Sequence, residues 1–236
     1  MKLSVVMPVY NERGTILEIL DRVRAVDIDK EIIIVDNCST DGTREIVEAI
    51  DHPGVRTILQ DRNRMKGNSV KKGIAAARGE YTIIQDADLE YDPRDYLPLL
   101  AEVERDEVLA VLGSRVLGVA LRGERMPPNQ FAVGRDFLND WFNMLFGTDL
   151  TDIATCYKLA PTDFLQNLDL VSDGFDLDFE LPAKFVLEAR WRDQIVSEVP
   201  IRYYPRSIEE GKKIRWTDGV ASLAAITRFR FVEPGG

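Results

Sequence analysis

The most distinctive chemistry in the sequence lies in Asp86-Ala87-Asp88, which follows an apolar run at 81–84. Where the chain leaves a strand, it can turn carboxylates at positions i and i+2 toward one ion. Hard oxygen ligands of this kind suit Mg²⁺ or Mn²⁺, which completes its shell with phosphate oxygens and water. Two adjacent acids also repel each other unless a cation or basic group compensates them. The segment therefore predicts a divalent cation site with Mg²⁺ or Mn²⁺ as the cofactor.

Several other catalytic arrangements are not expected. The sequence has no G-x-x-x-x-G-K-[ST] loop and no G-x-G-x-x-G after its first strand, so ATPases and dinucleotide-dependent dehydrogenases lose their main support. The only histidine, His52, lies in the turn Asp51-His52-Pro53-Gly54, which speaks against Ser-His-Asp and Cys-His catalysis. Cys38 and Cys156 are too few for a disulfide framework, and we expect both to be reduced thiols.

The first half of the chain alternates strand and helix patterns. Apolar runs predict strands at 3–7, 31–36, 55–59, 81–85 and 108–112, and apolar residues at helical spacing predict helices between them. Such crossovers produce a parallel sheet flanked by helices, with ligands at the carboxyl ends of its strands. Polar clusters follow three of these strands, namely Tyr10-Asn11-Glu12, Asp36-Asn37 and the acidic segment 86–90. We expect the ligand site at this edge of the sheet.

The second half of the chain is less regular. We expect a loop with Pro and Arg residues at 117–128, strands at 154–159 and 195–204, and helices at 131–145, 179–189 and 220–229. No repeat or interdomain linker is evident. The whole chain, 1–236, therefore predicts a single α/β domain with a C-terminal helical and loop extension.

The charge balance restricts the partners. A formal net charge of −10 and a pI near 4.8 predict that no nucleic acid is bound, since that needs an extended basic surface. Between Arg202 and Arg230, however, seven basic residues stand against three acidic ones, which indicates an anionic ligand or an anionic membrane surface. No apolar run approaches the ~20 residues of a membrane helix, and no signal peptide is recognised. We expect a cytoplasmic protein, with peripheral contact at the cytoplasmic membrane face as the further expectation.

An ordered set of motifs resembles family 2 glycosyltransferases of GT-A fold. The motifs are Val5-Val6-Met7-Pro8-Val9-Tyr10-Asn11-Glu12, the turn Val35-Asp36-Asn37-Cys38-Ser39-Thr40-Asp41-Gly42-Thr43, Gly67 in Asn63-Arg64-Met65-Lys66-Gly67, and Gln85-Asp86-Ala87-Asp88. Within that family the chain is most similar to the branch of dolichyl-phosphate mannose synthase and other polyprenyl-phosphate sugar transferases, through Gln85-Asp86-Ala87-Asp88-Leu89-Glu90-Tyr91-Asp92-Pro93 and Gly113-Ser114-Arg115. The resemblance implies a Rossmann-like GT-A domain. Its half 1–115 would bind nucleotide sugar and metal, and its half 116–236 would bind the acceptor.

The resemblance also assigns roles to individual residues. It implies that the nucleoside is surrounded by Pro8, Tyr10, Glu12 and Asp36, with Asp36 accepting from the base. It implies further donor contacts at Lys66, Gly67, Asp86, Ala87 and Asp88, and metal ligation by Asp88 and Glu90. Arg115 and Lys213 would act in catalysis by facing phosphate groups of the donor or acceptor. Position 37 departs from the pattern, because Asn stands where the family commonly has a second acid.

These assignments lead to a mechanism. In an inverting transfer from a UDP- or GDP-hexose, the metal and nearby cations would stabilise the departing diphosphate. An acceptor phosphate is already an anion, whereas an acceptor hydroxyl would need a base, for which Asp152 is the candidate. Inversion itself is implied by the resemblance alone.

Several alternatives remain open. The expected acceptor is a polyprenyl phosphate, dolichyl or undecaprenyl, and the alternative is a soluble small molecule, natural product or glycan. A sugar nucleotidyltransferase would need a Gly-rich basic loop after the first strand, for which Asn11-Glu12-Arg13-Gly14 is a poor substitute. A non-catalytic nucleotide-sugar binding protein is the third interpretation.

Overall fold

The computed structural model of the chain describes residues 1–123, 132–206 and 216–231. Within these residues a seven-stranded sheet has the order β3-β2-β1-β4-β6-β5-β7. The strands are β1 (Leu3–Val9), β2 (Lys30–Asp36), β3 (Val55–Leu59), β4 (Tyr81–Ile84), β5 (Val108–Ser114), β6 (Lys158–Pro161) and β7 (Ile195–Pro200). Among these seven described strands, β6 alone runs antiparallel to its neighbours, β4 and β5. The prediction of an α/β fold with a mostly parallel sheet is confirmed.

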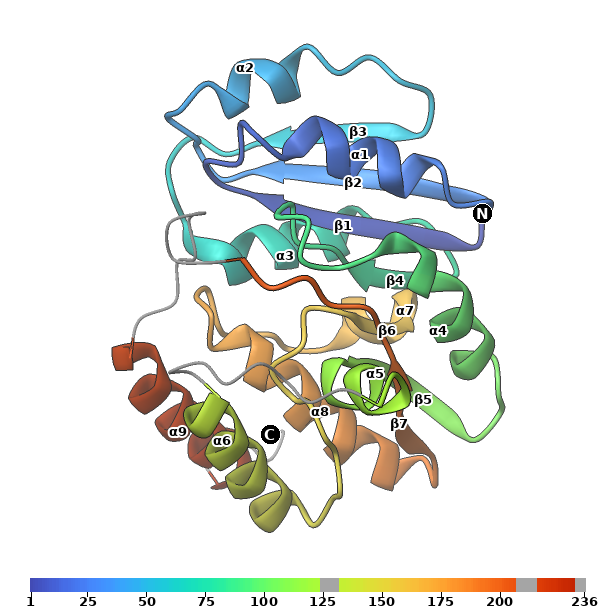
Figure 1. The fold of residues 1–236 in the computed structure, drawn as a ribbon, viewed down its shortest axis with the longest axis vertical. Helices are drawn as coiled ribbons and strands as arrows, with labels where there is room; N and C mark the ends of the chain where they lie inside the picture. Colours follow the sequence, from blue (N-terminus) through green and yellow to red (C-terminus); the bar gives the residue numbers. More distant parts are fainter. Residues whose placement is uncertain (124–131, 207–215, 232–236) are drawn as a thin grey trace.

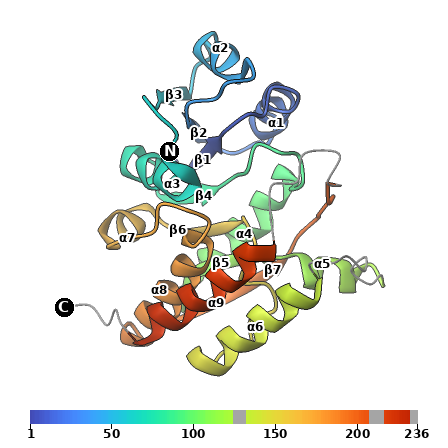
Figure 2. The same cartoon turned by 90° about the vertical axis from the view of Figure 1, so that its left-hand side faces the viewer.

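Helices cover both faces of this sheet. They are α1 (Ile16–Arg24), α2 (Thr43–Glu48), α3 (Met65–Ala76), α4 (Tyr96–Val103), α5 (Arg115–Leu121), α6 (Ala132–Phe146), α7 (Thr162–Asn167), α8 (Leu177–Trp191) and α9 (Trp216–Phe231). Helices α3, α7 and α8 lie on one face, and α1, α4 and α5 lie on the other (Figures 1 and 2). The C-terminal helix α9 packs against α6 and α8, so it is joined to the body of the domain. No helix in the described part of the chain is long and apolar enough to cross a membrane.

The central strands are buried on both faces because helices cover each side. All seven residues of β1 are buried, as expected for a strand inside a largely parallel sheet. Val6 and Ile33 pack with Ala77 on the face covered by α3, whereas Val5 and Met7 belong to the larger core cluster. A core of this kind holds the carboxyl ends of β1, β2 and β4 in a fixed relation, and the candidate site lies there.

The structure corrects two predictions in the second half. Residues 115–121 form helix α5 where a loop was expected from 117, with the Ser114 hydroxyl accepting from the Leu117 N–H at its N-terminus. Residues 154–157 are not in a strand, and β6 begins only at Lys158. Side-chain contacts hold this preceding segment, since the Cys156 N–H donates to the Tyr91 hydroxyl. Neither a seven-residue helix nor such contacts produce a periodic pattern in the sequence.

Candidate active site

The three polar clusters predicted from the sequence lie together at the carboxyl edge of the sheet. Strands β2, β1 and β4 are parallel neighbours, so their ends point the same way. The loops after β1 and β2 are also joined directly. The Asn11 N–H donates to Ser39 Oγ at 3.0 Å, and the Glu12 N–H donates to Thr43 Oγ1 at 2.9 Å. The sheet therefore brings residues 10–12, 36–37 and 86–90 into one region.

Asp36 organises the turn after β2. Its carboxylate is fully buried and accepts hydrogen bonds from the N–H groups of Cys38 and Ser39, at 3.1 and 3.3 Å. Arg44 of α2 completes the set with Nη1 at 3.0 Å from Oδ2. Hydrogen bonds of this kind fix a carboxylate at a strand end, in the region where the sequence predicted the nucleoside.

Asn37 has a structural reason for being an amide. Its Oδ1 accepts from the Arg64 N–H at 2.8 Å, while its Nδ2 donates to Asn63 Oδ1 at 3.0 Å. A carboxylate at this position could accept but could not donate to Asn63. Asn37 therefore ties the end of β2 to the loop that precedes α3.

In the acidic segment 86–90, Asp86 and Asp88 form ion pairs with different basic residues. Leu89 has a φ of +63°, an uncommon conformation for a branched residue that turns the chain sharply after Asp88. Ala87 is buried, while Asp86 pairs with Lys66 at 3.1 Å and Asp88 pairs with Arg206 at 3.0 Å. The two carboxylates therefore have different partners and do not share one ion pair.

Asp88 belongs to a group that we call the acidic cluster: Glu12, Asp88, Glu90 and Arg206. The Arg206 guanidinium lies 3.1 Å from Glu12 and 3.0 Å from Asp88, and the Arg206 N–H donates to Glu90 Oε1 at 2.7 Å. Among the residues that the structure describes, three carboxylates thus surround Arg206. Burial, with the charges of Asp86 and Glu90, raises the pKa of Asp88 to about 7.

This cluster fits a divalent cation that is shared with a ligand. No set of three or more His, Cys, Asp or Glu side chains within the described residues is arranged to enclose a metal by itself. Asp88 Oδ1 accepts from the Glu90 N–H, and Glu90 Oε2 accepts from the Tyr203 hydroxyl, both at 3.1 Å. Mg²⁺ commonly uses only one or two carboxylates and takes its other ligands from phosphates and water. The carboxylate donors therefore suit such a cation, and Asp88 and Glu90 are the protein ligands that the sequence predicts.

Arg115 and Asp152 form a buried bidentate pair. Arg115 Nε and Nη2 each lie 2.7 Å from an oxygen of Asp152, and the Asp152 side chain has no exposed surface. Glu198 on β7 fixes the same loop by accepting from the N–H groups of Thr151 and Asp152, at 2.7 and 2.9 Å. Asp152 as a proton acceptor stays a prediction, and this pairing weighs against it because both oxygens are already engaged.

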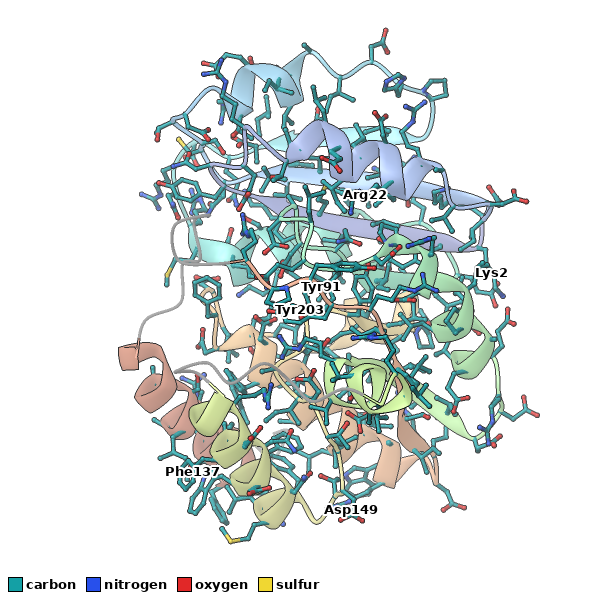
Figure 3. All side chains as sticks on the ribbon, in the orientation of Figure 1. Lys2, Arg22, Tyr91, Phe137, Asp149 and Tyr203 are labelled. Atoms are coloured by element: carbon teal, nitrogen blue, oxygen red, sulfur yellow. The ribbon has the colours of Figure 1, made fainter. Side chains whose placement is uncertain are left out.

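Tyr203 connects the buried pair to the acidic cluster. The Arg115 guanidinium lies 5.1 Å from the centre of the Tyr203 ring, and the hydroxyl of Tyr203 donates to Glu90. Tyr91 packs edge-on against the same ring, with 5.5 Å between ring centres, and both tyrosines lie near the middle of the domain (Figure 3). A continuous set of contacts therefore runs from Asp152 to Glu90.

Pro8, Tyr10 and Gly67, which were also predicted to contact the donor, lie in three different environments. Pro8 lies within β1, Tyr10 is half-buried just after it, and Gly67 packs against the backbone of residues 172–174. Their contacts with a donor stay predictions. Lys213 and residues 124–131 lie outside the described residues.

Four charged or polar residues near the site were not assigned to it from the sequence: Lys158, Asp178, Tyr203 and Arg206. Arg206 falls in the basic C-terminal segment, which was the only signal for it. Lys158 ends the segment 151–158, which is similar to soluble-domain members of the family, but no role was assigned to it. Asp178 and Tyr203 lie in no motif that the sequence singled out.

The sheet and the polar clusters at its carboxyl edge define an α/β protein with a candidate ligand site at the strand ends, and sequence comparison names the family. The profile of Glycosyl transferase family 2 matches residues 4–160. The chain belongs to this family.

Two curated relatives are each 30% identical to the chain. One is the low-salt glycan biosynthesis hexosyltransferase Agl6 of Haloferax volcanii, aligned over 88% of this chain and 49% of that protein. The other is the dolichol-phosphate mannosyltransferase of Saccharomyces cerevisiae, aligned over 89% of this chain and 80% of that protein. A third, the glycosyltransferase AglJ of H. volcanii, is 27% identical, and the alignment covers 63% of it. The chain thus spans about half of Agl6 and less than two thirds of AglJ.

Solved structures share the fold. Glucosyl-3-phosphoglycerate synthase from Mycobacterium tuberculosis aligns with all of this chain and 80% of its own, with a TM-score of 0.71 at 17% identity. Mannosyl-3-phosphoglycerate synthase from Rubrobacter xylanophilus aligns with 97% of this chain and 72% of its own, with a TM-score of 0.72 at 16% identity. At these identities the likeness establishes the GT-A fold.

Proposed function

We propose that this protein transfers a hexose from a UDP- or GDP-sugar, with inversion, to a polyprenyl phosphate. The acidic cluster carries this proposal. It gathers the carboxylates of Glu12, Asp88 and Glu90 around Arg206 at the carboxyl edge of the sheet, in a member of a glycosyltransferase family. A Mg²⁺ or Mn²⁺ ion bound to these carboxylates with the diphosphate of a donor would stabilise the leaving group.

Each part of the site has a role in this proposal. Asp36 and the loop held by Asn37 contact the nucleoside. Asp88 and Glu90 hold the cation that binds the diphosphate. Asp152 orients Arg115 so that its guanidinium faces a phosphate of the acceptor or donor. An acceptor phosphate attacks as an anion, so the chain needs no proton acceptor for this reaction.

Two observations on relatives support the donor and cofactor assignments. The M. tuberculosis structure was solved in complex with Mn²⁺, UDP and phosphoglyceric acid. The yeast relative is named a dolichol-phosphate mannosyltransferase. The first agrees with a metal and a nucleotide diphosphate at a GT-A site, and the second agrees with a lipid phosphate as acceptor.

A thermal-shift panel tests the donor and metal. UDP-, GDP-, dTDP- and CDP-sugars are added with and without Mn²⁺ to the wild type, to Asp88→Ala and to the control Asp149→Ala, whose carboxylate is exposed beyond α6 (Figure 3). A ligand at a hundred times its dissociation constant should raise the melting temperature by about 5–10 °C. We expect Mn²⁺-dependent stabilisation by one nucleotide in the wild type and in Asp149→Ala, but not in Asp88→Ala. A folded wild type that responds to none of them would contradict the proposal.

The acceptor is tested by product analysis. The donor found above is incubated with undecaprenyl phosphate or dolichyl phosphate in detergent, and separately with 3-phosphoglycerate or glycerol. We expect release of nucleoside diphosphate and a hexose in the lipid extract only with the polyprenyl phosphates. Transfer to 3-phosphoglycerate or glycerol alone would instead favour a soluble acceptor, and pyrophosphate release would favour a nucleotidyltransferase.

Peripheral membrane contact is the remaining part of the proposal. Phe137 and Met144 are exposed on one side of α6, and Phe231 and Arg228 are exposed at the end of the neighbouring α9. Apolar side chains beside basic ones can rest on an anionic bilayer surface without crossing it. We expect sedimentation with phosphatidylglycerol vesicles, reduced in Phe137→Ser/Met144→Ser and unchanged in Trp191→Ser, whose exposed ring lies on α8. Equal sedimentation of the wild type, the Phe137→Ser/Met144→Ser variant and Trp191→Ser would contradict membrane contact through this surface.

A further inference from the structure

Tyr203 lies between two parts of the candidate site that come from different segments of the chain. Its hydroxyl donates to Glu90 Oε2 at 3.1 Å, on the side of the acidic cluster. The centre of its ring lies 5.1 Å from Arg115 Cζ, on the side of the buried pair with Asp152. Glu90 follows β4, Arg115 begins α5 and Tyr203 follows β7. One side chain therefore contacts both a predicted cation ligand and a predicted phosphate-binding residue.

The backbone around Tyr203 is bonded to the segment that carries Glu90. Tyr203 forms an antiparallel β-bridge with Tyr91. Further along the chain, the Tyr204 N–H donates to the Glu90 carbonyl at 2.8 Å, and the Arg206 N–H donates to Glu90 Oε1 at 2.7 Å. These bonds hold the backbone of Tyr203 beside Glu90, so the contact between the phenol and the carboxylate is built into the fold.

The hydrogen bond between Tyr203 and Glu90 is compatible with cation binding. A phenol is protonated at neutral pH and donates, while a carboxylate has two oxygens with about four lone pairs. Glu90 can therefore ligate a cation and still accept from Tyr203. Hydrogen bonds to a ligating group fix its orientation, and their loss typically weakens metal binding or activity by about 10–100-fold. A cation bound to Glu90 would in turn hold the phenol in place.

The contact with Arg115 transmits this restraint to the other part of the site. A tyrosine side chain has no rotatable bond between its hydroxyl oxygen and its ring, so fixing one fixes the other. The guanidinium of Arg115 is attracted to the face of the Tyr203 ring, while Asp152 holds its Nε and Nη2, each at 2.7 Å. The ring therefore links the orientation of the guanidinium to the orientation of Glu90.

We propose that Tyr203 is a positioning residue that couples the two ligands: cation and nucleotide bound at the acidic cluster strengthen the binding of an acceptor phosphate at Arg115. This inference rests on the proposed function and adds an order of binding to it. With Glu90 fixed by the cation, Tyr203 and Arg115 lose less freedom when a phosphate arrives, so the phosphate binds more tightly. Coupling is reciprocal, so the phosphate must strengthen the binding of cation and nucleotide by the same factor.

Binding of a short, water-soluble acceptor probe tests the coupling. The dissociation constant of farnesyl phosphate is measured by calorimetry for the protein alone and for the protein saturated with Mn²⁺ and UDP or GDP, whichever binds. The ratio of these two constants is the coupling factor. Couplings between sites commonly correspond to factors of about 5–150, and we expect at least about fivefold in the wild type. The constant for the nucleotide, measured with and without farnesyl phosphate, should change by the same factor.

Two changes at Tyr203 separate its two contacts. Tyr203→Phe removes the hydroxyl and keeps the ring beside Arg115. Its coupling factor should fall below about twofold, while farnesyl phosphate binds the protein alone within about twofold of the wild type. Tyr203→Leu removes the ring as well, so it should also weaken the binding of farnesyl phosphate to the protein alone, by about threefold to tenfold. A merely structural role of Tyr203 would lower stability without removing the coupling in the conservative Tyr203→Phe.

Tyr204 and Tyr96 provide matched controls. The side chain of Tyr204 is 52% exposed, so Tyr204→Phe removes a hydroxyl at the next position along the chain without removing a buried contact. Tyr96→Phe removes a buried hydroxyl that donates to Gln85 Oε1 at 2.5 Å, so it should lower the melting temperature. Both variants should keep the coupling factor of the wild type.

The outcomes are distinguishable. A wild-type coupling factor near one, or a factor that survives in folded Tyr203→Phe, overturns the inference and leaves the proposed function standing. A wild type that binds nucleotide but no farnesyl phosphate overturns the inference together with the polyprenyl acceptor. A folded wild type that binds neither UDP nor GDP overturns the proposed function itself and the inference that rests on it.

Discussion

The guanidinium of Arg206 lies 3.0 Å from the carboxylate of Asp88, the second acid of the acidic segment. The same side chain reaches Glu12 at 3.1 Å, so one internal cation bridges the segments that follow β1 and β4. In the described conformation Arg206 occupies oxygens that a bound divalent cation would need. A cation bound to Asp88, as proposed, would therefore compete with Arg206.

This competition predicts an unusual effect of removing a positive charge. Arg206→Gln frees Asp88 and raises the negative charge of the acidic cluster, so Mn²⁺ should bind more tightly in the absence of nucleotide, by roughly threefold to tenfold. Electron paramagnetic resonance of free Mn²⁺ measures this directly. Arg202→Gln is the control, since its half-exposed guanidinium pairs with Asp92 and Asp95. Weaker Mn²⁺ binding in Arg206→Gln would show that Arg206 assists the metal.

The Arg115–Asp152 pair predicts strong coupling in stability. Asp152→Asn and Arg115→Met each leave one buried charge without its partner, and each should lower the free energy of unfolding by about 3–5 kcal/mol. The double variant leaves no unpaired charge, so its loss should be smaller than the sum of the single losses by at least about 1 kcal/mol. Urea unfolding of the four proteins provides the measurement. Additive losses would mean that the two side chains stabilise the fold independently.

The buried carboxylate of Glu31, far from the candidate site, is expected to make the free energy of unfolding depend on pH. Burial would raise the pKa of Glu31, but hydrogen bonds from Ser4, Arg56 and the Arg78 N–H hold it below its ordinary value of 4.5. Because the folded-state pKa is the lower one, Glu31 adds stability above about pH 4.5, and that contribution is lost as the pH falls through the folded-state pKa. Urea unfolding between pH 3 and pH 7 should show a flatter pH dependence in Glu31→Gln than in the wild type. The exposed, surface-paired Glu18 should give a wild-type profile when changed to Gln.

Close packing at Gly67 is expected to matter both for stability and for ligand binding. A Cβ at this position would lie 2.8 Å from backbone atoms of residues 172–174, so Gly67→Ala forces α3 away from the segment before α8. We expect a loss of about 1–3 kcal/mol in the free energy of unfolding, together with weaker nucleotide-sugar binding as Lys66 moves from Asp178. Gly134→Ala in α6 has open space around its Cβ and should keep or slightly raise stability. Unchanged unfolding of Gly67→Ala would contradict the close approach.

The elements of the first half could be predicted from the sequence because their signals are local. The apolar run at 108–112 falls within β5, whose residues are all buried, and the apolar spacing after residue 16 coincides with α1, most of whose apolar positions are buried. In each case the pattern reflects which residues of one element are buried. Where burial came from contacts with distant segments, as at 154–157, the predicted strand was wrong.

The candidate site likewise has some features that could be predicted from the sequence and others that could not. The acidic segment after β4 and the turn after β2 were found from their residues alone, since a strand end followed by acids is visible in the chain. The reason for Asn37 was not visible, because its amide is explained by Asn63 and Arg64, which lie in the next crossover.

The sequence by itself determined the family, the positions of the first five strands along the chain and the position of the acidic segment, because these depend on neighbouring residues and on motifs. Only the tertiary structure decided which charges meet. Arg206 is 118 residues from Asp88, and Asp178 is 112 residues from Lys66. Those pairings depend on how α8 and the segment after β7 pack against the sheet, and the energy of an ion pair depends on distance and burial rather than on sequence separation.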